Sequence, residues 1–96
     1  MSKFSRSKGV RGEQFIAKAL NAKRVGIAFK KTAIDVEGDY FVGQVRNCPQ
    51  SSKEILDALI ALEKEASPTL RKFVFVKPRR GTWLVIQRLE QFCKEK

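Results

Sequence analysis

The fold of this chain is decided by residues 33–46, which read AIDVEGDYFVGQVR. Two β-favouring runs, 33–36 and 40–46, flank an acidic, glycine-containing segment at 37–39. A short segment of this kind between two such runs is typical of a hairpin turn. We therefore expect two neighbouring antiparallel strands here, with successive side chains on alternate faces.

The segments on either side of this hairpin predict the remaining elements. Residues 8–22 and 52–66 place apolar side chains mostly three or four positions apart, as in helices packed on a core. Ser51 and Glu54 form a capping-box pair at the start of the second helix. The predicted order is a helix, a three-strand meander, a helix, two strands and a short helix, over residues 8–22, 24–29, 33–36, 40–46, 52–66, 72–77, 82–87 and 89–94. This order predicts an α/β (α+β) fold with five strands.

The length of 96 residues is that of one small domain, so we expect a single domain over residues 1–96. The hydrophobic fraction of 43% and the charged fraction of 31% are ordinary for a folded protein. No apolar run approaches the roughly 18 residues of a membrane span, and the basic N-terminus lacks the apolar stretch of a secretory signal. We expect a cytoplasmic protein without a membrane partner.

The chain is strongly basic, with 20 Lys and Arg against 10 Asp and Glu and a net charge of +10. The positive charge gathers at both ends: residues 1–31 carry +8 and residues 68–96 carry +6, while residues 32–67 carry −4. This distribution favours a phosphate-rich partner, above all nucleic acid, through counterion release. A basic, solvated surface with no specific partner is the alternative.

Several kinds of catalytic and metal site are excluded by residue content. The chain has no histidine, and its two cysteines, Cys48 and Cys93, lack CxxC spacing. Zinc-finger, Ser-His-Asp and Cys-His sites are therefore absent. A bound metal ion would need oxygen ligands.

One group of residues has the composition of an oxygen-ligand site. If residues 40–46 fold back along 33–36, Asp35, Gln44 and Arg46 come together as a carboxylate, an amide oxygen and a cation. Phosphodiester hydrolysis uses such groups, because oxygen ligands hold Mg²⁺ and a cation stabilises the developing charge. The alternative is that these acids are simply turn residues.

Three motifs together resemble the PD-(D/E)XK nuclease superfamily: Glu13 in the first predicted helix, Asp35, and the run QVR at 44–46. Residues 9–15, GVRGEQF, look like the helix of archaeal and phage Holliday junction resolvases in which a glutamate projects toward the metal. Residues 77–86, KPRRGTWLVI, are similar to their late β-hairpin. The resemblance covers most of the chain and implies a restriction-endonuclease-like core with a mixed five-stranded sheet.

The resemblance implies a site in which Glu13, Asp35 and Gln44 bind Mg²⁺, with Mn²⁺ as a substitute, and Arg46 completes the catalytic set. Gln44 and Arg46 stand where the family usually has Glu and Lys. An amide oxygen still ligates a hard cation, and a guanidinium can bind the scissile phosphate but cannot act as a base. The alternative for Glu13 is that it only complements the helix dipole.

The implied activity is a Mg²⁺-dependent endonuclease that resolves four-way DNA junctions, with no small-molecule substrate. Two symmetric cuts imply a homodimer with two sites related by a two-fold axis. Eight basic residues are expected to contact DNA: Lys3, Arg6, Lys8, Arg11, Lys30, Lys31, Arg79 and Arg80. The alternative for the paired basic residues is that they lie in solvated loops. Trp83 either packs in the core or stacks on an exposed DNA base.

Two other functions remain open on the sequence. A binding module of the same fold could recognise junctions or duplexes without cutting, which Gln44 and Arg46 motivate. A basic protein that binds RNA or an acidic host protein is the third possibility. Under that hypothesis the grouping of Glu13, Asp35 and Gln44 is a coincidence.

Overall fold

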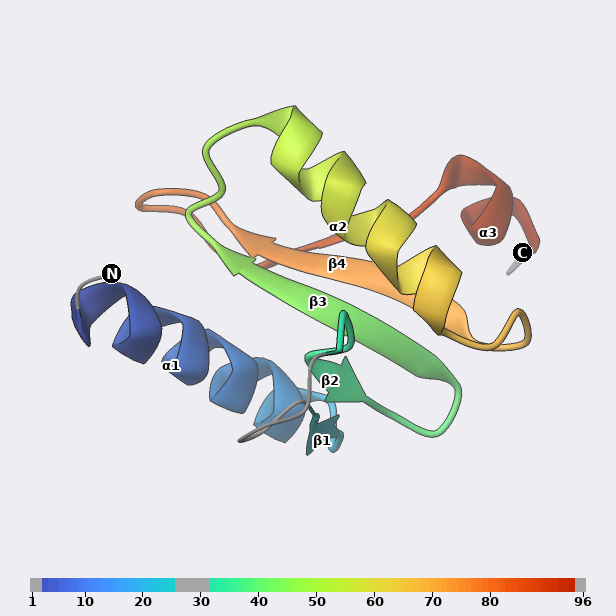
Figure 1. Cartoon of the computed structure of the whole chain (residues 1–96), viewed down its shortest axis with the longest axis horizontal. Helices are drawn as coiled ribbons and strands as arrows, with labels where there is room; N and C mark the ends of the chain where they lie inside the picture. The colour runs from blue at the N-terminus through green and yellow to red at the C-terminus, as the bar shows by residue number, and fades with distance from the viewer. Residues whose placement is uncertain (1–2, 26–31, 95–96) are drawn as a thin grey trace.

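The computed structural model describes residues 3–25 and 32–94, with side chains described from residue 11 onward in the first range. Five strands form one mixed sheet with helices on both faces (Figure 1). The predicted α+β class and the order of the elements are confirmed. Within these ranges, none of the helices has the length and apolarity needed to cross a membrane.

The strands lie in the sheet in the same order as in the chain: β1 Lys23–Arg24, β2 Val36–Glu37, β3 Phe41–Asn47, β4 Arg71–Lys77 and β5 Leu84–Ile86. The first three form an antiparallel meander, in which Val36 lies opposite Gly43. β3 and β4 are parallel, and β5 returns antiparallel to β4 at the far edge. The parallel pair requires a crossover connection. Helix α2 provides it.

The helices divide between the two faces of the sheet. α1, Lys3–Ala19, packs on one face, while α2, Ser52–Glu65, crosses the other face between β3 and β4 (Figure 1). α3, Leu89–Lys94, ends the described chain near the end of α2. Its Gln91 amide bonds the backbone of Lys72, which ties α3 to β4.

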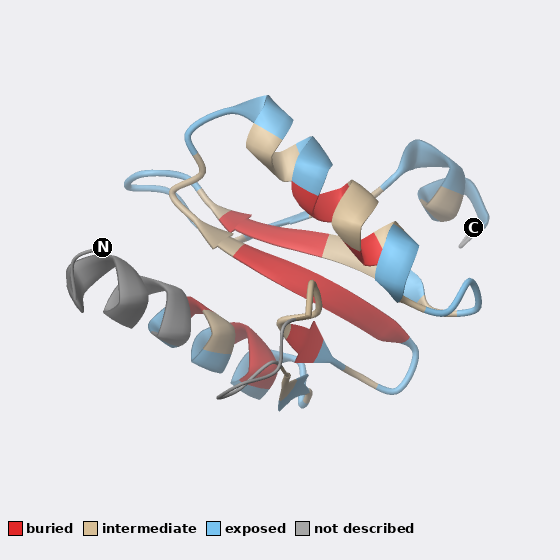
Figure 2. Cartoon of the chain, in the orientation of Figure 1, coloured by how far each residue is buried: buried red, intermediate tan, exposed pale blue. Residues whose placement is uncertain are grey.

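The core has two layers because β3 is covered on both faces (Figure 2). Phe41 and Val45 pack with Ile16 of α1, whereas Val42 packs with Leu59 of α2. The predicted alternation of side chains along this strand is therefore confirmed. A strand covered on both faces buries successive residues, and five in a row are buried here.

Helix α2 begins as the sequence predicts. The Ser51 hydroxyl accepts the Glu54 N–H, and the Glu54 carboxylate accepts the Gln50 N–H. The apolar stripe of the helix is largely covered by its own sheet: Leu59 and Leu62 are buried. Leu56 is half exposed.

We expect Leu62→Ala to lower the free energy of unfolding by about 2–5 kcal/mol, because it leaves a cavity under α2. Leu62 is fully buried. Leu56→Ala is the matched control on the same helix and should cost less than about 1 kcal/mol. Urea unfolding followed by circular dichroism measures both. Equal losses in the two variants would show that α2 does not pack on the sheet as described.

Strand β2 is shorter than the predicted strand over 33–36, and that prediction was wrong for its first three residues. Side chains, not the sheet, bond the N–H groups of its first two residues: Ala33 N–H donates to the Glu65 carboxylate and Ile34 N–H donates to the Thr32 hydroxyl. Thr32 also donates to Glu65. Regular strand geometry therefore begins only at Val36, although the Asp35 backbone already bonds Gly43 and Val25.

The strand predicted over 24–29 is β1, which begins one residue earlier and is two residues long. Positions 26–29 lie outside the described residues, as do Lys30 and Lys31, which were expected to contact DNA. Lys3, Arg6 and Lys8 lie on α1, but their side chains also fall outside the description.

Candidate functional site

The candidate site lies where β2 and β3 separate. Because β2 begins only at Val36, Asp35 lies just before its first residue and beside β3. The Val45 N–H donates to the Asp35 carboxylate at 2.9 Å. Asp35 also bonds both neighbouring segments through its backbone, to Gly43 and Val25. The position of this carboxylate is therefore set by main-chain contacts from two segments, β3 and the residue after β1.

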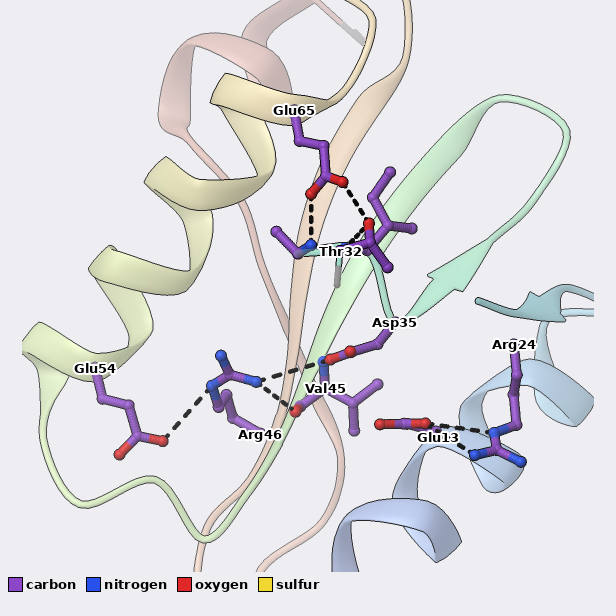
Figure 3. A network of polar contacts seen from close by, with 10 residues as sticks. Glu13, Arg24, Thr32, Asp35, Val45, Arg46, Glu54 and Glu65 are labelled. Atoms are coloured by element: carbon purple, nitrogen blue, oxygen red, sulfur yellow. Dashed lines mark hydrogen bonds and ion pairs between the residues drawn. The ribbon is translucent and has the colours of Figure 1, made fainter. Parts of the chain in front are cut away.

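Asp35 lies between a cation and a second acid (Figure 3). Arg46 Nη1 is 3.7 Å from Asp35 Oδ2, and the Glu13 carboxylate faces Asp35 from α1. Burial raises the pKa of Asp35 to about 6; the Val45 hydrogen bond opposes this rise, the Glu13 charge adds to it, and the charges of Arg46 and Arg24 oppose it. A carboxyl group of this kind changes protonation near neutral pH, as functional carboxyl groups often do.

Glu13 is held by an arginine that the sequence did not reveal. Arg24 donates from Nε and Nη2 to Glu13 Oε1, at 3.3 and 3.2 Å. Arg24 belongs to β1 and lies opposite Val36 in the sheet, so it also approaches Asp35. Only the pairing of β1 with β2 could have identified it. The helix-dipole explanation of Glu13 does not fit, because Glu13 lies well beyond the first turn of α1.

Gln44 lies deep in the sheet and is 4% exposed. Its Oε1 is buried and has no hydrogen-bond donor within the described part of the chain. An unsatisfied buried carbonyl is costly, and native proteins seldom leave one unexplained. Gln44 lines a pocket of about 360 Å³ on the α2 face with Arg46, Glu54 and Asp57. Gln44 therefore has an acceptor without a partner, and its side chain lines the α2 face of the sheet.

Arg46 connects the two faces of the site. Its guanidinium lies 3.7 Å from Asp35 and 3.7 Å from Glu54, and it donates to the Val45 carbonyl at 3.1 Å (Figure 3). The side chain is about one third exposed. Both ion pairs are long, so the guanidinium retains donor capacity for an incoming anion.

The described residues contain no group of three His, Cys, Asp or Glu side chains that could hold a metal ion. The oxygens that suit a hard divalent cation are the carboxylates of Glu13 and Asp35 and the orphan Oε1 of Gln44. Arg24 and Arg46 compete for the two carboxylates. An ion bound there would displace or share these ion pairs.

Three of the expected DNA contacts gather elsewhere. Arg11, Arg79 and Arg80 line one groove between α1 and the turn after β4. Phe15 and Lys77 line the same groove, and the sequence did not single them out. Trp83 lies there too: it is partly buried against the core and stacks on Phe15.

Comparison with known proteins adds no relative. No family model matches the chain, and neither a curated protein nor a solved structure matches it significantly.

The raised pKa of Asp35 predicts how stability varies with pH. The pKa of Asp35 is about 6 in the folded state, against 3.8 for an ordinary aspartate such as that of the unfolded chain. The folded state therefore binds the proton more tightly. The free energy of unfolding should therefore fall as pH rises from about 4 to 6, by roughly 2 kcal/mol. Asp35→Asn should lack this fall.

Urea unfolding in EDTA at several pH values, with native protein and Asp35→Asn compared at each pH, isolates the contribution. Glu63 and Glu65, whose pKa values are lowered, by the Arg88 and Thr32 hydrogen bonds first of all, contribute an opposite trend in both proteins. A constant difference between the two proteins from pH 4 to 7 would show that Asp35 is not buried as described.

Proposed function

We propose that this chain is a Mg²⁺-dependent endonuclease that cleaves branched DNA, with four-way junctions as the leading substrate. The observation that carries the proposal is the placement of Asp35 at the point where β2 and β3 separate, between Glu13 and Arg46 and bonded to Gly43 and Val45 of β3. The order of helix, meander, helix and strand supports it, since the PD-(D/E)XK resemblance implies this order.

Each residue has a distinct role in this proposal. Glu13 and Asp35 would hold the ion, which when bound polarises the phosphoryl oxygen and lowers the pKa of a water. Gln44 was expected to join them, but its side chain lines the pocket on the α2 face, whereas Glu13 comes from α1 on the other face of the sheet. Arg46 would contact the scissile phosphate and stabilise the charge that develops on it. Exposed Lys and Arg side chains beyond this group would bind neighbouring phosphates and orient the DNA.

The proposal includes a homodimer, because two symmetric cuts need two sites related by a two-fold axis. It also places the protein in the cytoplasm, where the DNA of a bacterial, archaeal or phage genome is found. Neither point depends on how the ion is held.

A second candidate is a module of the same fold that binds branched DNA without cutting it. The observation that favours it is the pairing of each carboxylate with an arginine, Glu13 with Arg24 and Asp35 with Arg46. In this case the guanidinium groups occupy the positions that an ion would need.

One assay separates the two. Purified protein is incubated with labelled four-way junction, linear duplex and single strand, in Mg²⁺, Mn²⁺ or EDTA. A nuclease gives paired symmetric nicks in the junction that require the metal. Tight junction binding with no product in either metal supports the binding module, and neither binding nor product contradicts both.

A further inference from the structure

One groove of the described chain lies at the carboxyl ends of the two parallel strands. β3 ends at Asn47 and β4 at Lys77, and both residues line the groove. Its volume is about 1030 Å³, and α1 and the turn at 78–83 form its walls. We call it the basic groove. Ligand pockets usually have about 300–1,000 Å³, so there is room for more than one nucleotide.

The charge of the basic groove is uncompensated. Four cations line it, Arg11, Lys77, Arg79 and Arg80, and no acid does. These four side chains form no ion pair with a carboxylate of the described residues, in contrast to Arg24, Arg46, Lys53 and Arg88. The groove therefore has a positive potential that attracts a polyanion.

Two aromatic rings lie among these cations. Phe15 is 55% exposed and stacks on Trp83, with ring centroids 5.9 Å apart and planes at 15°. The other edge of the indole lies against Gly12, where a Cβ would be 3.0 Å from the ring. The indole thus lies between α1 and the Phe15 ring, and Phe15 is the exposed member of the pair.

The turn adds a backbone observation. Arg80 has φ of 59°, a left-handed conformation that glycine adopts without strain and other residues seldom adopt. Gly81 N–H closes the turn onto the Pro78 carbonyl at 2.9 Å. An arginine at such a position is understandable if its charge is needed there.

Cations beside an exposed aromatic face match one kind of polyanion best. The phosphates of a nucleic acid would contact the four basic side chains, while its nucleobases would stack on Phe15 and Trp83. In a duplex the faces of the bases are covered by their neighbours, so only unpaired bases are able to stack. An acidic protein would use the cations but would leave the aromatic pair without a role.

We propose that the basic groove binds a short unpaired stretch of DNA through base stacking on Phe15 and Trp83. The inference rests on the proposed function for the choice of DNA, and it deepens that function by adding unpaired bases to the substrate. Arg11 and Phe15, four residues apart, share one flank of α1, and Glu13 lies on the other. The helix therefore separates the basic groove from the candidate site, and the substrate passes both flanks.

Trp83 is the only tryptophan of the chain, so its fluorescence reports on this groove alone. The full-length protein is titrated in EDTA with an oligo-dT of about twelve nucleotides, with the duplex of the same length, with oligo-U and with polyglutamate. Oligo-dT should quench the fluorescence strongly and the duplex should not. Equal quenching by duplex or by polyglutamate would overturn the proposal, and tighter binding of oligo-U would overturn the choice of DNA.

Variants separate stacking from charge, with affinity measured by anisotropy of labelled oligo-dT. Phe15→Ala should weaken oligo-dT binding by about tenfold, because one stacking contact is lost, and should leave duplex binding unchanged. Changing Arg79 to Ala and Arg80 to Gly should weaken both and flatten the slope of log affinity against log salt by about 1.4 for oligo-dT.

The matched control is Lys53→Ala with Lys64→Ala, which removes the same charge from exposed positions on α2. It should leave the salt slope for oligo-dT unchanged, and equal flattening in both double variants would contradict the groove. The variant with Gly at position 80 should unfold at no lower urea concentration than the native protein, so a loss of binding cannot come from unfolding.

These experiments can contradict the stacking proposal and the endonuclease proposal independently. Quenching by oligo-dT without junction cleavage supports the groove and contradicts the endonuclease. Cleavage of the junction without quenching by oligo-dT supports the endonuclease and contradicts the groove.

Discussion

Asp35→Asn should abolish metal-dependent cleavage of a four-way junction while the affinity for the junction stays unchanged or increases. Asparagine still offers an oxygen to the Val45 N–H, so the fold at this point is kept. It removes one of the two carboxylates that would bind the ion and a negative charge that would face the DNA phosphates. A loss of several kcal/mol of transition-state stabilisation corresponds to about a thousandfold or more in rate.

Single-turnover rates on a labelled junction, together with gel-shift affinities in EDTA, measure both halves of this expectation. Glu37→Gln is the matched control, because it neutralises an exposed acid only two residues away, on β2. The control should cleave like the native protein. Cleavage by Asp35→Asn at the native rate would remove Asp35 from the mechanism and the metal site with it.

Arg46→Ala should reduce the cleavage rate by about a hundredfold or more, as does the loss of other groups that stabilise charge in the transition state. Arg46 lies 3.7 Å from both Asp35 and Glu54, so the alanine variant leaves two acids without their shared cation. Arg46→Lys should keep or raise the rate. Lysine keeps the charge and restores the residue usual in the resembling family, although it loses any bidentate phosphate contact.

The same rate assay distinguishes the outcomes for Arg46. Arg88→Ala is the control, because Arg88 is also a paired arginine but its partner is Glu63 of α2. Cleavage that appears only in Arg46→Lys, or only when Gln44→Glu is added to it, identifies a nuclease fold retained for binding. Equal rates in the native, lysine and alanine proteins would exclude Arg46 from the reaction.

The order of the elements could be predicted from the sequence because it depends on local features. Apolar spacing predicted both long helices, and Ser51 with Glu54 predicted where α2 begins. The alternation of Val42 and Val45 between two faces follows from strand geometry alone. These signals act over a few neighbouring residues, so no knowledge of the tertiary structure is needed to recognise them.

The late start of β2, at Val36 and not at residue 33, could not be predicted in this way. The segment 33–36 has the composition of a strand, but Glu65, some thirty residues later, bonds the N–H of Ala33 and the hydroxyl of Thr32. A distant carboxylate thus replaces the sheet as the partner of Thr32 and Ala33. Two residues after Ala33, the Asp35 carboxylate accepts the Val45 N–H.

The sequence by itself determined the class of fold, the residue types of the candidate site and the excess of positive charge. The tertiary structure alone decided which charges meet: Arg24 with Glu13, Arg46 with Asp35, and no acid in the basic groove. The basic groove joins residues from positions 11 to 83, which come together only when β3 and β4 pair in parallel and α1 packs across them. Burial, pKa and electrostatic potential depend on such distances in space, and distances in sequence do not contain them.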